Sequence, residues 1–103
     1  MKEFNKLVRD KIPEIIEKDG KKANIEIIED DDRYVAELKK KLVEEVDEFL
    51  KDESMEELGD VFQVMLAILK VGGYNLGDLC EIADAKEEEK GGFNKRIFLK
   101  SVE

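Results

Sequence analysis

The sequence predicts an all-α fold: a helical bundle with one minor, hairpin-like pairing of two short extended segments near residues 25–28 and 96–102. Apolar residues recur at the helical period along three long segments, and short polar turns or glycine pairs separate these segments. The three segments are residues 33–51, 55–71 and 76–90. With 103 residues, of which 42% are hydrophobic, the chain is expected to form one domain, residues 1–103.

The N-terminal part of the chain predicts an ordered arm, a short helix and then a short strand. Pro13 suits the first turn of a helix and Gly20 suits a helix end, so residues 13–18 are expected to be helical. Residues 25–28 are rich in isoleucine and mostly alternate with acidic residues, which is typical of a strand. The tail, residues 93–102, is β-branched and aromatic and is the expected partner of that strand.

Capping residues mark where the long helices begin and end. Acidic residues 29–32 precede the first long helix, where they suit the N-cap and the positive end of the helix dipole. Asn75 is expected to cap the third long helix. The glycine pairs 72–73 and 91–92 are expected to end the second and third.

Two pairs of carboxylates lie at helical spacing on the first two long helices. Glu45 and Glu48 flank the apolar stripe of the first helix, and Glu57 and Asp60 begin a strip of the second helix that is otherwise apolar. The polar turn at residues 52–54 is short, so the two helices are expected to be antiparallel neighbours with both pairs close together. Such a cluster forms an oxygen-lined site for a hard divalent cation. Partly buried carboxylates need a compensating partner of this kind.

Each pair also has a simpler interpretation. The segment from Ser54 to Glu57 fits a capping box, in which the Glu57 side chain accepts a hydrogen bond from the Ser54 amide. Glu45 and Glu48 fit the solvated surface of a chain that is 44% charged. The metal-site hypothesis therefore depends on the two pairs taken together.

Composition restricts the function further. A net charge of −9 and a pI near 4.7 argue against binding to a nucleic-acid polymer, whose phosphates attract basic surfaces. Basic residues gather near both ends of the chain, where they suit a small anionic ligand. Cys80 is the one cysteine and there is no histidine, so we expect no disulfide within the chain, and a reducing cytoplasm fits best. The charged beginning of the sequence and the interrupted apolar stretch 61–71 predict no signal peptide and no membrane span.

The second long helix is apolar nearly all round between residues 61 and 69. A helix of this kind must be buried on several sides, and three helices in one protomer cover only some of them. The sequence therefore predicts a homodimer or a higher homo-oligomer.

Three blocks of sequence carry a family resemblance. The EExxE pattern of Glu44, Glu45 and Glu48, followed by the ExxD pattern of Glu57 and Asp60, resembles the MazG-like all-α nucleoside triphosphate pyrophosphohydrolases. That superfamily also contains phosphoribosyl-ATP pyrophosphohydrolase. The opening NKLVRDKIPEII and the closing KEEEKGGFNKRIFL resemble its branch of small house-cleaning phosphohydrolases. The resemblance extends over nearly the whole chain, with the three blocks in order along it.

The resemblance implies a reaction and a set of site residues. A metal-activated water would attack between the α and β phosphates of a nucleoside triphosphate, giving a nucleoside monophosphate and pyrophosphate, in the removal of non-canonical nucleotides. Mg²⁺, with Mn²⁺ as an alternative, would be held by Glu45, Glu48, Glu57 and Asp60. The catalytic carboxylates would be Glu44, Glu45 and Glu48, with Glu44 orienting the water. Candidates for contact with the nucleotide and its phosphates are Asn5, Lys6, Arg9, Lys11, Lys86, Lys90 and Arg96.

Three further points qualify this expectation. Members of the branch commonly have arginine before GGF, where this chain has Lys90, which cannot form a bidentate fork on phosphate. Hydrolysis of phosphoribosyl-ATP in histidine biosynthesis is the alternative reaction, with the same chemistry on a larger substrate. The non-enzymatic alternative is a helical oligomerisation module, in which the acidic pairs are only caps and surface charge.

Overall fold

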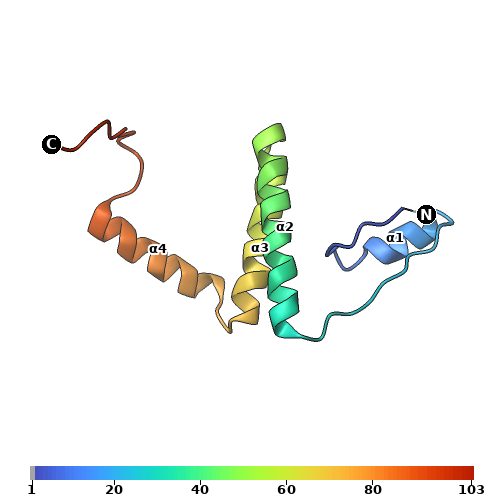
Figure 1. Cartoon of the computed structure of the whole chain (residues 1–103). Coiled ribbons are helices and arrows are strands. Elements are labelled where there is room, and N and C mark those ends of the chain that lie inside the picture. Colours follow the sequence, from blue (N-terminus) through green and yellow to red (C-terminus); the bar gives the residue numbers. More distant parts are fainter. Residues whose placement is uncertain (1) are drawn as a thin grey trace.

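The computed structural model describes residues 2–103, and this part of the chain contains four α-helices and no β-strand (Figure 1). The helices are α1 (Ile12–Lys18), α2 (Asp31–Asp52), α3 (Met55–Val71) and α4 (Leu76–Lys90). The prediction of an all-α fold is confirmed. Among the described residues, no helix combines the length and the apolar character needed to cross a bilayer.

Side-chain caps set where the three long helices begin. The side chains of Asp30, Ser54 and Asn75 each accept a hydrogen bond from the backbone N–H three residues further on, at 3.1, 3.1 and 2.9 Å. At the start of α4 the bond is reciprocated, because the Asn75 backbone N–H donates to the Asp78 carboxylate at 2.9 Å. The cap on Asp30 starts α2 two residues before the predicted position of residue 33.

The short first helix follows the prediction closely. α1 includes Pro13 in its first turn and ends at Lys18, with Asp19 as its C-cap. Gly20 follows with a φ of 80°, a left-handed conformation that glycine adopts without steric cost. The chain therefore turns away from the helix at this point.

The centre of the molecule is the antiparallel pair formed by α2 and α3, which lie side by side (Figure 1). Leu38 of α2 and Val64 of α3 are its buried apolar residues, with exposed fractions of 4% and 9%. The segments before and after this pair lie on opposite sides of it (Figure 1). We call residues 2–11 the N-terminal arm, and we call α4 together with residues 91–103 the C-terminal arm.

The protomer is open. Its radius of gyration is 18.2 Å, whereas a compact chain of this length has a value of about 13 Å. Its accessible surface is 9618 Å², whereas a folded monomer of 11.9 kDa exposes about 6000 Å². A large part of the apolar surface is therefore not covered within one copy of the chain.

The predicted pairing of residues 25–28 with residues 96–102 is wrong. Neither segment forms a strand, and they lie at opposite sides of the molecule (Figure 1). The reason is that α4 leads away from the α2–α3 pair and takes the tail with it, so neither segment has an edge to pair with. An isolated two-stranded pairing is also marginal in water. Both segments keep exposed isoleucines, among them Ile27 and Ile97.

Candidate metal centre

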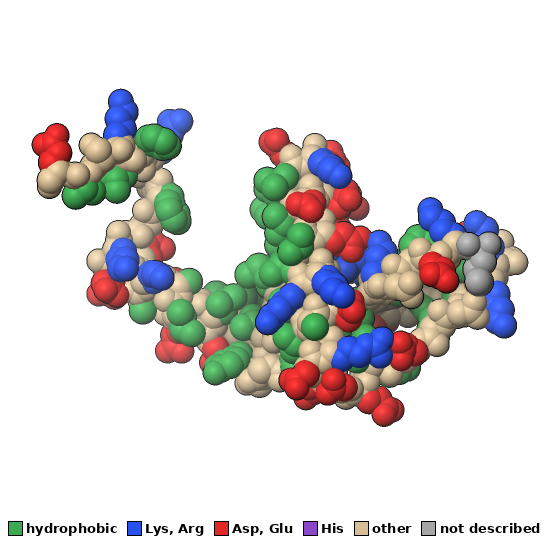
Figure 2. All heavy atoms as spheres, in the orientation of Figure 1, with side chains coloured by type: hydrophobic (Ala, Val, Ile, Leu, Met, Phe, Trp, Pro, Cys, Tyr) green, Lys and Arg blue, Asp and Glu red, His purple; other side chains and the backbone are tan. Residues whose placement is uncertain are grey.

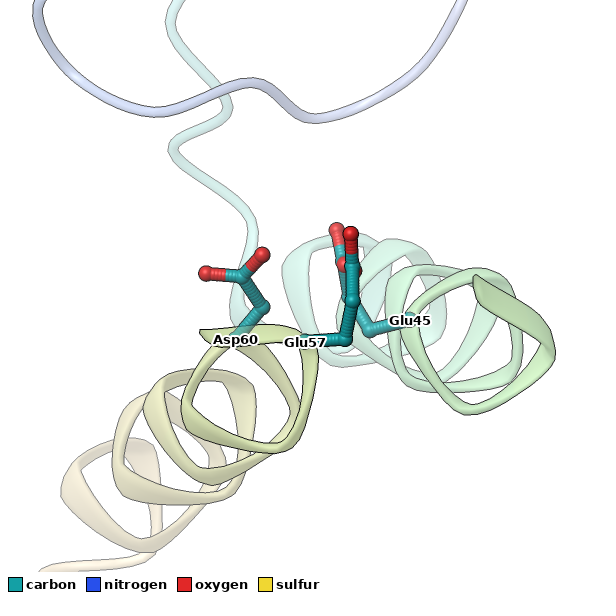
Figure 3. Close-up of side chains that lie close together, drawn as sticks. All are labelled: Glu45, Glu57 and Asp60. Carbon is teal, nitrogen blue, oxygen red and sulfur yellow. The ribbon is translucent and has the colours of Figure 1, made fainter. Parts of the chain in front are cut away.

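Three of the four predicted metal ligands converge where α2 and α3 pack together. Glu45 of α2 and Glu57 and Asp60 of α3 each place one carboxylate oxygen within 4.8 Å of the others. Figure 3 shows the three side chains projecting from neighbouring faces of the two helices toward the same space. Opposite ligands of one Mg²⁺ or Ca²⁺ ion lie roughly 4 to 5 Å apart, twice the metal–oxygen distance. The spacing of this carboxylate cluster therefore suits one hard cation.

The fourth predicted ligand, Glu48, lies outside this cluster. Its side chain is exposed, whereas the three cluster residues are partly buried. The negative charge of Glu48 nevertheless acts on the carboxylate cluster. Partial burial raises the pKa of Glu57 above its ordinary value, and the negative charges of Asp60, Glu48, Asp52 and Glu45 add to the increase.

The hydrogen bonds at the start of α3 distinguish between the two interpretations of Glu57. Its backbone N–H donates to the Ser54 hydroxyl at 3.1 Å, so the N-cap is present. Across the described residues, however, no hydrogen bond runs from the Ser54 amide to the Glu57 carboxylate. A complete capping box, with both of its hydrogen bonds, forms at Asn75 and Asp78 instead. The Glu57 side chain points toward the cluster rather than back to the helix start.

The N-terminal arm brings two cations to these helices. Arg9 Nη2 donates to Asp60 Oδ1 at 2.6 Å, and Arg9 Nη1 donates to the side-chain oxygen of Gln63. Lys6 Nζ donates to Glu44 Oε1 at 2.7 Å. These contacts join positions that are 51 and 38 residues apart in the sequence, so they place the arm against the α2–α3 pair.

A third cation comes from α2 itself. Lys41 lies 3.2 Å from Glu44 and 3.4 Å from Glu45, at the helical spacings of three and four residues. The hydrogen bond from Lys6 lowers the pKa of Glu44, and Lys41 adds to the effect. Sequence reasoning missed Lys41 and Gln63 as site residues. The signal for both was their helical offset, since Lys41 precedes Glu45 by four residues and Gln63 follows Asp60 by three.

The other residues predicted to contact substrate are not brought to the cluster. Asn5 and Lys11 belong to the N-terminal arm and are exposed. Lys86 and Lys90 on α4 and Arg96 in the tail are exposed as well, and the C-terminal arm carries them away from the α2–α3 pair (Figure 1). Within one copy, Arg9 and Lys41 therefore pair with residues of the carboxylate cluster, and Lys6 pairs with the adjacent Glu44.

A groove of about 700 Å³ runs between the N-terminal arm and the α2–α3 pair. Arm residues 7–10 line one side, the buried Leu38 and Val64 contribute to the apolar lining, and Glu45 and Asp60 contribute carboxylates. Its volume falls in the range of about 300 to 1000 Å³ that is usual for small-molecule sites. The groove therefore joins an acidic region to an apolar one, with Arg9 and Lys41 in its lining.

Comparison with models of protein families, with curated proteins and with solved structures finds no match to this chain.

Proposed function

We propose that this protein is a Mg²⁺-dependent nucleoside triphosphate pyrophosphohydrolase of the MazG-like type, acting on non-canonical nucleotides. The observation that carries the proposal is the convergence of Glu45, Glu57 and Asp60, whose carboxylate oxygens lie within 4.8 Å of one another beside a groove with cationic residues. Carboxylate oxygens are the ligands that Mg²⁺ prefers, and Mn²⁺ accepts the same set. The donor set therefore fits the ion.

The residues of the chain have separate roles in this proposal. Glu45, Glu57 and Asp60 would hold the ion, which would supply a bound water of lowered pKa and neutralise phosphate charge. Lys6 and Lys41 lower the pKa of Glu44, so this carboxylate is ionised at neutral pH, and it would accept a hydrogen bond from the attacking water. The water oxygen bonds to phosphorus and the bridge between the α and β phosphates breaks. Nucleoside triphosphate and water give nucleoside monophosphate and pyrophosphate.

The cations beside the cluster are suited to hold the substrate. A guanidinium such as that of Arg9 can donate two parallel hydrogen bonds to phosphate oxygens, whereas Lys41 acts as a point charge. Without such groups, an acidic cluster in a chain of net charge −9 would repel a triphosphate. The apolar part of the groove, near Leu38 and Val64, offers a surface for the base.

The proposal includes assembly into a homodimer or a higher homo-oligomer. Figure 2 shows hydrophobic side chains gathered along one edge of the α2–α3 pair, near the turn that joins the helices. Exposed large hydrophobic residues recur at helical spacing on both helices at this end: Val43, Val46 and Leu50 on α2, and Met55, Leu58 and Phe62 on α3. Two such stripes side by side form an apolar face of the kind that packs in a four-helix arrangement. The large accessible surface of the open protomer supports the same conclusion.

The test of the metal site is calorimetric titration of the full chain with Mg²⁺, compared with Glu57→Gln and with the neighbouring Glu56→Gln. Glu56 is exposed and lies outside the cluster, so it controls for the loss of one charge. We expect wild type and Glu56→Gln to bind the ion and Glu57→Gln to lose most of that binding. Equal binding by all three proteins would place the ion elsewhere.

The test of the reaction is pyrophosphate release from a panel of normal, deaminated and oxidised nucleoside triphosphates, with phosphoribosyl-ATP as a separate substrate. Release that requires Mg²⁺ and is fastest with a modified nucleotide supports the proposal. A preference for phosphoribosyl-ATP would assign the alternative reaction. Absent release with every substrate would leave the oligomerisation module as the better description, and Mg²⁺-independent release would contradict the role of the ion.

A further inference from the structure

The N-terminal arm already supplies a cation to the carboxylate cluster. The Arg9 guanidinium lies 2.6 Å from an Asp60 oxygen, and its other terminal nitrogen donates to Gln63. Three residues earlier, Lys6 is paired with Glu44 on α2. The arm is thus attached to both helices by charged groups, and its residues 7–10 form one side of the groove.

The Arg9 contact has a consequence for ion binding. A divalent ion that takes Asp60 as a ligand needs the carboxylate that the guanidinium now neutralises. Placing both cations against Asp60 and its neighbours would also bring like charges within a few ångströms of each other, which is unfavourable. Ion binding and the Arg9–Asp60 pair are therefore alternatives. The pair is partly exposed, so the competition is weak enough for an ion to win.

We propose that the N-terminal arm is a strap released by cation exchange: Arg9 is the counter-ion of Asp60 in the cation-free protein, and a divalent cation at the carboxylate cluster displaces it. This inference rests on the proposed function for the identity of the ion. The freed guanidinium remains tethered beside the groove, where it can bind an anion such as a phosphate group. Cation and anion binding are then coupled, because each is favoured when Arg9 leaves Asp60.

The side-chain resonances of the arginines test the displacement directly on the wild-type chain. The arginines are Arg9, Arg33 and Arg96. Arg33 is paired with Glu26 at 2.6 and 3.1 Å, away from the cluster, and serves as an internal reference. During titration with MgCl₂, with KCl at equal ionic strength as control, we expect the Nε–H signal of Arg9 to move and that of Arg33 to stay. Asp60→Asn should move the Arg9 signal without any added Mg²⁺.

Calorimetry measures the competition between Arg9 and Mg²⁺ for Asp60. Arg9→Gln removes the competing guanidinium, so its dissociation constant for Mg²⁺ should fall roughly two- to five-fold, the range that exposed ion pairs are worth. Lys11→Gln removes the same charge from the same arm, but Lys11 has no ion pair within the described residues. Its effect should stay within about 1.5-fold, because exposed charges without a contact are screened over roughly 10 Å at 0.1 M salt.

The outcomes separate this inference from the proposed function. Mg²⁺ binding by wild type and its loss in Glu57→Gln would support the metal site. If the Arg9 signal then does not move and Arg9→Gln binds Mg²⁺ no more tightly than wild type, the proposed release of the strap is wrong although the metal site is retained. Equal tightening in Arg9→Gln and Lys11→Gln would also overturn it, since bulk charge would then explain the effect. If wild type binds no Mg²⁺ at all, the metal site and the cation exchange are both wrong.

Discussion

The two arms of the molecule differ in how they relate to the α2–α3 pair. The N-terminal arm returns to the pair through Lys6 and Arg9, which form ion pairs with carboxylates far along the sequence. The C-terminal arm reaches outward, and from Cys80 to Glu103 every residue is exposed. Its tail shows large hydrophobic side chains almost fully to solvent, with Phe93 at 96% and Phe98 at 85% exposed.

The two arms therefore require different partners. Ion pairs between an arm and the helices are satisfied within one chain and tolerate an exposed surface, because charged groups remain hydrated. Apolar side chains exposed to this extent gain stability only when another surface covers them, at about 25 cal/mol per Å² of apolar area buried. We therefore expect the N-terminal arm to act in each copy by itself and the C-terminal arm to act through an assembly.

The largest expected effect concerns the site that the N-terminal arm contacts. Asp60→Asn keeps the shape of the side chain but removes a charge from the ion, so Mg²⁺-dependent pyrophosphate release should fall on the order of 100- to 1000-fold. Circular dichroism should show unchanged helix content, and Glu56→Gln should retain activity. Near-wild-type turnover of Asp60→Asn would exclude the cluster as the metal site.

The next effect concerns assembly. Phe62→Glu places a charge in the apolar face of the α2–α3 pair. An aromatic side chain at the centre of an interface contributes about 2 kcal/mol or more to binding, so the dissociation constant of the assembly should rise roughly 30-fold. Sedimentation should show a dimer or larger species for wild type and a shift toward monomer for the variant. Ile25→Glu, at an exposed isoleucine in the connection between α1 and α2, is the matched control. A wild-type monomer at micromolar concentration would contradict the assembly.

A smaller effect compares one arginine from each arm. Arg9→Ala and Arg96→Ala should each raise KM for the nucleotide by roughly three- to ten-fold with less change in kcat, because cations that hold phosphates contribute mainly to substrate binding. Arg96 lies on the outward arm, so its effect should vanish in the Phe62→Glu background, whereas that of Arg9 should persist. An unchanged KM for Arg96→Ala in wild-type background would remove the C-terminal arm from the site.

The smallest effect is on stability and depends on pH. The pKa of Glu57 is raised in the folded protein, so the folded state binds its proton more tightly than the unfolded state does. Stability from this group is therefore present at low pH and is lost as the pH rises from the unfolded value, about 4.5, through the folded pKa. Glu57→Gln should be more resistant to urea than wild type at pH 7 without Mg²⁺. The difference should shrink below pH 4.5, and a constant difference at both pH values would contradict the raised pKa of Glu57.

The helices were predictable because their signals are local. Asp30, Ser54 and Asn75 cap their helices through contacts three residues away, and Gly20 follows α1 in a left-handed conformation. The proximity of Glu45 to Glu57 and Asp60 was also predictable from the sequence, because it follows from the helical period and one short turn. These features depend on contacts within one helix or across one short helical hairpin.

The other features of the fold and of the site depend on contacts that no local sequence pattern encodes. The isoleucines of residues 25–28 have the character of a strand, but a strand requires a partner, and the tail is carried away by α4. The exclusion of Glu48 from the cluster depends on side-chain position at the helix surface. The pairing of Arg9 with Asp60 joins residues 51 positions apart, which a list of basic residues near the N-terminus cannot reveal.

The short turn between α2 and α3 has a kinetic consequence. Glu45 and Asp60 are brought together by one helical hairpin, and closing so short a loop takes roughly tens of nanoseconds, far less than a distant pairing. The carboxylates of the cluster are therefore expected to meet early in folding, before the arm that carries Arg9 reaches the α2–α3 pair. During that interval a dissolved cation would not compete with Arg9 for Asp60. The order of folding would therefore favour binding of the cation to the carboxylate cluster.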